Sequence, residues 1–177
     1  MAWSVPMTAV AGSVFTAAQF NQYVRDNLAV TAPALASTVS SYFVTDSPNS
    51  IVERYATSDF QSGSSTTTST TYADLADGVH PTVSVVTGTM AWVAVYCNMN
   101  HSSSLATWMS YTVSGATTSA AADDHAFQLQ GQNGQRAGAV ILHTGLTPGT
   151  NVFTGKYRVS TSGTGTFSVR RISVLPL

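Results

Sequence analysis

The sequence predicts a mainly β protein: an antiparallel β-sandwich, jelly-roll-like, preceded by an extended N-terminal arm and one short helix. Hydrophobic residues make up 44% of the 177 residues, and the polar remainder is rich in Ser, Thr and Gly, a mixture that favours strands because β-branched and aromatic side chains suit a pleated surface. From about residue 37, apolar and polar side chains alternate in short runs between turn-forming residues. Residues 14–28 instead repeat with the period of a helix.

The chain begins with an apolar segment that we expect to be an extended arm. Pro6 restricts Val5 to an extended conformation. Trp3 and Met7 add large apolar side chains to the same segment. An anchor that buries these side chains on a partner is therefore expected, with a frayed terminus as the alternative.

A helix start follows the arm. Thr16 is a suitable N-cap residue, and Gln19 three positions later completes a capping box. Phe15 and Phe20 occupy the two positions of a hydrophobic staple. These signals place the first helical turn immediately after Thr16.

One face of the predicted helix is apolar. Phe20, Tyr23, Val24 and Leu28 recur at the spacing of a single helical face. A helix of about three turns is marginally stable alone in water, so this face is expected to dock on something. Its partner is either the rest of the chain or another subunit, and Pro33 is expected to end or kink the helix before a linker.

The remaining residues form the expected body. The chain is accordingly divided into an N-terminal arm and helix over residues 1–36, which would anchor the protein, and a β-sandwich body over residues 37–177. The sequence indicates roughly eight to ten short strands at the spacing typical of a sandwich or jelly roll. The expected strands are 38–44, 51–57, 66–75, 82–86, 90–99, 105–113, 126–130, 136–143, 151–160 and 166–174.

Two of these strands differ from the simple alternation. Residues 90–99 and 137–142 are apolar on both faces, which is typical of strands covered on both sides. In a chain of this size they indicate a subunit interface, for which Trp92, Tyr96 and Trp108 are the candidate residues.

The last strand contains an irregularity. Its alternation changes phase between Val169 and Ile172, across Arg170 and Arg171. A β-bulge is therefore predicted there.

Composition and motifs argue against several functions. Charged residues are only 8% and the formal net charge is −1, so neither nucleic acid nor a membrane is an expected partner. There is no apolar run of membrane-spanning length and no secretory signal, so the chain is expected to be made in the cytoplasm. Cys97 excludes an intrachain disulfide because it is the single cysteine.

No catalytic or metal-binding constellation is evident, so we expect a non-enzymatic protein without a cofactor. Cys97 shares an apolar face with Val93 and Val95, which predicts a buried, inert thiol. The densest polar group is 123–125, Asp-Asp-His, for which a solvated turn and a contribution to a cation site are both open. No metal-ligand spacing involves the four histidines, which are His80, His101, His125 and His143.

Two parts of the sequence carry a resemblance to a known family. The first is the N-terminal pattern Trp3, Ala11-Gly12, Thr16-Ala17, Asn21 and 24–28 (Val-Arg-Asp-Asn-Leu). The second consists of residues 69–75, 111–117, 145–149, 157–160 and 174–177. The first resembles the opening segment, and the second the β-rich body, of virion structural proteins of tailed bacteriophages that infect actinobacteria. These proteins are variously described as head fibre, decoration or minor tail proteins.

This resemblance implies a role in the virion. It implies a self-associating β-sandwich, a homotrimer, that assembles in the bacterial host cytoplasm and attaches to the major capsid protein or to tail proteins through its N-terminal segment. The candidate anchoring residues are Trp3, Val5, Phe15, Phe20, Tyr23, Val24 and Leu28.

Three roles follow from the resemblance. The first is an oligomeric decoration or head-fibre protein displayed on the capsid. The second is a minor tail or tail-fibre protein that binds a host-surface receptor, and the third is a glycan-cleaving enzyme. A host glycan would then be bound by aromatic residues, for which the sequence offers Tyr72, Trp92, Tyr96 and Trp108. A glycan-cleaving enzyme would require paired carboxylates, and the sequence indicates none.

Overall fold

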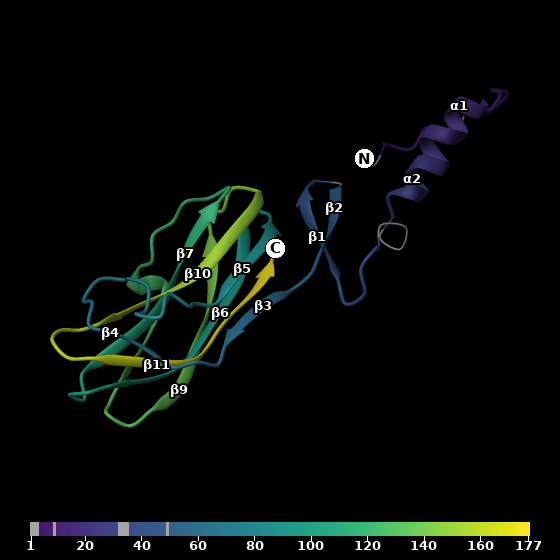
Figure 1. Cartoon of the computed structure of the whole chain (residues 1–177). Coiled ribbons are helices and arrows are strands. Elements are labelled where there is room, and N and C mark those ends of the chain that lie inside the picture. Colours follow the sequence, from purple (N-terminus) through teal and green to yellow (C-terminus); the bar gives the residue numbers. More distant parts are fainter. Residues whose placement is uncertain (1–3, 9, 32–35, 49) are drawn as a thin grey trace. The chain divides into compact units, whose positions relative to one another are not determined.

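The chain divides into two compact units, Met1–Tyr55 and Ala56–Leu177. They are seen in a computed structural model that describes residues 4–8, 10–31, 36–48 and 50–177 (Figure 1). The sequence-based division fell earlier, after residue 36. The predicted helix stop at Pro33 lies outside the described residues.

The described part of the N-terminal unit contains one helical run and one hairpin. The helical run consists of α1 (Ala17–Phe20), a π-helical segment η1 (Asn21–Arg25) and α2 (Asp26–Ala29). Strands β1 (Tyr42–Ser47) and β2 (Ser50–Arg54) pair antiparallel as a two-stranded sheet. The predicted short helix is therefore present, with a π-helical segment that the sequence did not indicate.

The start of the helix confirms the predicted capping box and staple. The backbone N–H of Gln19 donates to the Thr16 hydroxyl at 3.2 Å, and the backbone N–H of Thr16 donates to Oε1 of Gln19 at 3.0 Å. The rings of Phe15 and Phe20 meet edge to face with centroids 6.1 Å apart. The capping box pairs N–H groups at the start of the helix that would otherwise lack a partner. The staple packs two apolar rings across the same turn.

The second unit is a sandwich of two antiparallel sheets (Figure 1). The strand order is β5-β10-β7-β8 in the four-stranded sheet and β3-β11-β6-β9 in the five-stranded sheet, whose fifth strand, β4, pairs with β11. The bounds are β3 Thr57–Gln61, β4 Ser65–Thr67, β5 Thr82–Thr87, β6 Met90–His101, β7 Ala106–Gly115, β8 Phe127–Gln130, β9 Gln135–Thr144, β10 Gly149–Val159 and β11 Gly165–Pro176, with a short 3-10 helix η2 at Asp123–His125. Because successive strands such as β9, β10 and β11 alternate between the sheets, the arrangement is jelly-roll-like, and the predicted fold class is confirmed.

The core lies between the two sheets and follows the period-two alternation. Along β10, for example, buried residues alternate with partly exposed ones from Asn151 to Val159. The largest fully buried apolar side chains are Tyr111, Tyr157, Phe153, Phe167, Met99, Met109 and Ile172. The long strands of the two sheets thus contribute one face to the interior, as expected for a sandwich.

Three of the predicted strands are wrong in extent. The expected strand 38–44 begins only at Tyr42 and runs to Ser47. The expected strand 51–57 ends at Arg54, and a separate strand, β3, begins at Thr57. The expected strand 66–75 ends at Thr67, after which the backbone is irregular except for an isolated bridge at Ala73. There the side chain of Ser69 accepts from the N–H of Thr71, so local side-chain hydrogen bonds replace a continuous ladder.

The predicted bulge in the last strand is confirmed. The pairing of β11 with β6 shifts register between Ser168 and Arg171, and Val169 adopts a positive φ of 54°. The extra residue turns the neighbouring Arg170 into the interior, where its side chain is only 1% exposed. A charged side chain therefore occupies a position in the core next to Tyr157.

Arg170 is held there by acceptors from two loops. Its Nη1 donates to the carbonyl of Val79 at 2.6 Å, and its Nη2 donates to the carbonyl of Gly63 at 3.3 Å. The Nη2 atom also lies 3.4 Å from the carboxylate of Asp77. Because an unpaired buried cation is very costly, these contacts fasten both loops to β11.

A second polar cluster joins Tyr111 on β7, His143 on β9 and His125 of η2. The hydroxyl of Tyr111 and Nδ1 of His143 are 3.0 Å apart, and the rings of His125 and His143 have centroids 4.5 Å apart. Asp124 lies 3.7 Å from His125. Burial, followed by the neighbouring His125, lowers the pKa of His143, while Asp124 opposes this.

The cluster of Tyr111, His125 and His143 should make the folded protein less stable in acid. A histidine whose folded-state pKa is lowered from 6.5 stays neutral while the unfolded chain takes up a proton. The contribution of neutral His143 to the free energy of unfolding should therefore be complete above pH 6.5. It should decrease as the pH falls below that value. Denaturant titrations of His143→Gln across this range should show a weaker pH dependence than the wild type. An unchanged slope in His143→Gln would rule out this assignment.

Candidate functional site

The arm is tied to the helix by Asn27. Its side-chain oxygen accepts from the backbone N–H of Ser4 at 2.9 Å, and its amide donates to the carbonyls of Ser4 at 3.0 Å and Tyr23 at 3.1 Å. Asn27 is buried, unlike the other described residues of the helical run. Asn27 was not among the predicted site residues, although it lies in the motif that carries the family resemblance.

The candidate anchoring residues present a largely exposed apolar surface. Phe20 is 48% and Leu28 is 61% exposed, and Val5 and Phe15 are exposed as well. Tyr23 and Val24 are half-buried, and Trp3 lies outside the described residues. We call the described members of this set, which are Val5, Phe15, Phe20, Tyr23, Val24 and Leu28, the attachment surface.

A small cavity extends the attachment surface along the arm. It has a volume of about 270 Å³ and is lined by Met7, Val10, Ser13 and Phe15. Val10 and Val14 are also strongly exposed. The N-terminal unit therefore exposes apolar side chains beyond the predicted anchoring residues.

The residues that follow the helical run are organised by Glu53 on β2. Its carboxylate accepts from the backbone N–H groups of Ser37 and Thr38 and from the hydroxyls of Ser37 and Ser41. These hydrogen bonds, led by those from the two serine hydroxyls, lower the pKa of Glu53 to about 2. The carboxylate thus fixes the path of residues 37–41 beside the hairpin.

Two of the three candidate interface residues lie together on the five-stranded sheet. Trp92 and Tyr96 point away from the core on β6, and Trp92 is 41% exposed. Trp108 lies on β7 of the four-stranded sheet, under the guanidinium of Arg158. The structure therefore does not bring Trp108 to the same surface.

Neighbouring strands enlarge the apolar surface around Trp92. Leu142 on β9 and Leu175 on β11 are its cross-strand partners, and Val140, two residues from Leu142, is 66% exposed. A hollow of about 300 Å³ is lined by Trp92, Val140 and Leu175 together with Ala56, Ala94, Ser173 and Val174. We call Met90, Trp92, Val140, Leu142 and Leu175 the sheet surface. The two-sided apolar pattern of residues 137–142 indicated the part of this surface that lies on β9.

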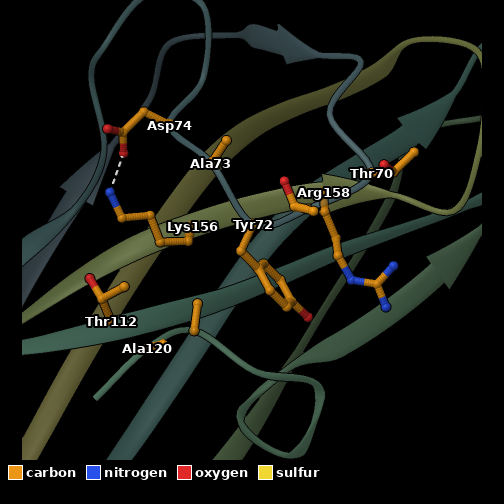
Figure 2. Close-up of a pocket in the computed structure, with 10 residues that line it drawn as sticks. Thr70, Tyr72, Ala73, Asp74, Thr112, Ala120, Lys156 and Arg158 are labelled. Carbon is orange, nitrogen blue, oxygen red and sulfur yellow. Dashed lines mark hydrogen bonds and ion pairs between the residues drawn. The ribbon is translucent and has the colours of Figure 1, made fainter. Parts of the chain in front are cut away.

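A groove of about 740 Å³ lies on the outer face of the four-stranded sheet (Figure 2). Its floor carries outward-facing side chains of β7 and β10, and its walls are two irregular segments on either side of these strands. The lining residues are Thr70, Thr71, Tyr72, Ala73, Asp74, Thr112, Ala120, Ala121, Lys156 and Arg158.

Arg158 is fixed in this groove by three neighbours. Its Nη2 donates to both carboxylate oxygens of Asp123, at 2.9 and 2.8 Å. The guanidinium carbon lies 3.7 Å from the centroid of Trp108 and 5.3 Å from that of Tyr72. Such charge-assisted and cation–π contacts hold a long side chain in one position.

Tyr72 completes the cluster by donating its hydroxyl to Oδ1 of Asp123 at 2.7 Å. Burial and this hydrogen bond raise the pKa of Tyr72. The hydrogen bonds from Tyr72 and Arg158 lower the pKa of Asp123. At neutral pH the phenol is therefore protonated and the carboxylate is charged.

A second ion pair lies at the other side of Tyr72. Lys156 contacts the carboxylate of Asp74, as Figure 2 shows, and Nδ1 of His80 lies 3.5 Å from the same carboxylate. Sequence spacing could not reveal these pairs because Asp74 and Lys156 are 82 positions apart. The aromatic residues Tyr72 and Trp108 were the one signal for this site.

The remaining residues that were considered for a catalytic or metal-binding role, Cys97 and Asp123, have structural surroundings. Burial raises the pKa of Cys97 to about 12, and the thiol is buried as predicted. Asp123, for which a cation site was open, is paired with Arg158. Within the described ranges there is no group of three or more His, Cys, Asp or Glu residues that could hold a metal ion.

None of the helices in the described part of the chain is both long and apolar enough to cross a membrane.

Comparisons with known proteins identify no family. No family model matches the chain, and no curated protein matches its sequence. Among solved structures, the Eiger TNF from S. frugiperda is similar with a TM-score of 0.46 and 10% identity, over 69% of this chain and 92% of that one.

Proposed function

We propose that this chain is a non-enzymatic structural protein of a tailed bacteriophage virion, displayed on the capsid as an oligomeric decoration or head-fibre protein. The N-terminal unit attaches the protein to the major capsid protein, and the β-sandwich is the displayed body. The resemblance of both parts to virion proteins of actinobacterial phages motivates this proposal.

The attachment surface is the observation that supports the proposal most strongly. Phe20 and Leu28 lie on one short helix and remain largely exposed, together with Val5 and Phe15. Soluble monomers rarely leave such a group of large apolar side chains exposed without an interaction partner. A helix of this length also gains most of its stability from docking, so the shell would both order it and bury it.

Self-association is assigned to the sheet surface. Trp92, Val140, Leu142 and Leu175 cover adjacent strands with exposed apolar area. Burial of such a surface between copies is the expected source of oligomer stability, and the resemblance implies a homotrimer.

A charge on the sheet surface should therefore dissociate the oligomer. Val140→Lys is expected to convert purified oligomer to monomer, because a lysine in the centre of an apolar interface loses its hydration. Val86 is a matched control: it is an exposed valine on the other sheet, and Val86→Lys should leave the oligomer intact. Light scattering after size-exclusion chromatography measures the mass, and oligomeric Val140→Lys or monomeric wild type would refute this interface.

A minor tail or tail-fibre protein that binds a host-surface receptor is the second candidate. The groove on the four-stranded sheet favours it, because it gathers aromatic, charged and hydroxyl groups at the surface. In that case purified protein should compete with phage for host cells. Under the first proposal, infection should be unaffected by added protein.

A further inference from the structure

The groove on the four-stranded sheet has the rigidity of a binding site. Arg158 is stacked on Trp108 and paired with Asp123, which also accepts from Tyr72. Lys156, whose side chain is only 19% exposed, is paired with Asp74. Side chains that are ordered before a ligand arrives lose little conformational entropy when it binds.

The charges of the groove balance each other. Each cation has its own carboxylate partner, Asp74 for Lys156 and Asp123 for Arg158. An anionic ligand would have to approach both carboxylates or displace them, and a cationic ligand would meet the two basic groups. The groove therefore favours a ligand without net charge.

The lining offers hydrogen bonds of both kinds beside small apolar areas. Asp74 is a pure acceptor and Lys156 a pure donor, whereas each threonine hydroxyl both donates and accepts. Three threonines line the groove, which are Thr70, Thr71 and Thr112. Three alanines and the ring of Tyr72 supply apolar contact area between these polar groups.

From this arrangement we infer that the groove binds a neutral carbohydrate. Sugar hydroxyls donate and accept in turn, which matches the mixed lining, and the C–H faces of a sugar ring pack on aromatic and alanine side chains. The volume of about 740 Å³ lies within the range of about 300–1,000 Å³ that is usual for small-molecule sites. The inference concerns the body alone and does not depend on attachment to a virion.

A glycan array probed with the purified, fluorescently labelled full chain tests this inference. The array carries neutral hexose, pentose and N-acetylhexosamine oligosaccharides beside uronic-acid and phosphorylated counterparts. We expect binding to neutral oligosaccharides. Binding confined to acidic glycans, or no binding to any of them, would overturn the inference.

Three variants then locate the site. Thr112→Val removes one hydroxyl from the floor at nearly constant shape and should weaken binding by about 3- to 10-fold, the effect of one neutral hydrogen bond. Ala120→Trp places a large side chain at an exposed position of the wall and should abolish binding. Thr144→Val, an exposed threonine of β9 in the other sheet, should bind like the wild type.

The outcome is independent of the virion proposal. Wild-type binding by both Thr112→Val and Ala120→Trp would place the sugar elsewhere and refute the groove. Circular dichroism of each variant confirms that the sandwich is folded before its binding is compared. Since the array contains no phage particles, a failure here leaves the attachment proposal standing, and a failure of attachment leaves the groove standing.

Discussion

Replacing Arg170 by methionine is expected to lower the free energy of unfolding by about 3 kcal/mol, from the usual cost of removing one member of a buried charged network. The guanidinium donates to the carbonyls of Val79 and Gly63 and contacts Asp77. Methionine fills much of the space but donates nothing, so these acceptors would be left without their charged donor. The loops that contain Gly63 and Asp77 should also exchange amide hydrogens faster.

Arg171→Met is the matched control for this prediction. Arg171 is the next residue of β11 but lies outside the core, where its guanidinium carbon is 5.0 Å from the ring centroid of Phe60. An exposed cation–π contact contributes only about 0.5–1 kcal/mol. Chemical denaturation of both variants gives the comparison, and equal losses for the two would show that the bulge does not place Arg170 in a special environment.

Charges on the attachment surface are expected to remove the protein from particles. Phe20→Asp combined with Leu28→Asp eliminates two large apolar side chains, each of which contributes about 1.5–3 kcal/mol when fully buried. Their combined loss corresponds to at least about 100-fold weaker attachment, before the cost of burying two carboxylates is added. Particles assembled with the variant should therefore carry little of it.

The control for attachment uses the polar side of the same helix. Gln22 is exposed, and Gln22→Asp adds a charge without removing apolar area. Quantitative mass spectrometry of purified particles measures incorporation relative to the major capsid protein. Normal incorporation of the Phe20 and Leu28 double variant, with the body folded, would exclude this surface as the anchor.

Features encoded within a few neighbouring residues could be predicted from the sequence. The capping box of Thr16 and Gln19 depends on a spacing of three residues, and the bulge at Val169 shows itself as a change of phase within one strand. The alternating strands of the sandwich are likewise local patterns. In the threonine-rich segment 66–75 the local pattern was misleading, because side-chain hydrogen bonds compete with strand pairing.

Features that depend on strand order could not be predicted. Tyr72 and Asp123 are 51 positions apart and meet only because an irregular segment and η2 both lie against the outer face of the four-stranded sheet. Trp108 was grouped with Trp92 by residue type, yet the two tryptophans lie on different sheets. Single-sequence patterns specify which side of a strand is buried, but not which strands become neighbours.

Cryo-electron microscopy of intact phage particles tests the proposed attachment most directly. We expect regularly spaced copies of the β-sandwich on the capsid, with the helix that carries Phe20 and Leu28 inserted between shell subunits. The attachment surface should be buried in the shell and the groove beside Tyr72 should face solvent. A few copies at the tail would contradict capsid display and favour receptor binding, and density absent from both capsid and tail would contradict a structural role in the virion.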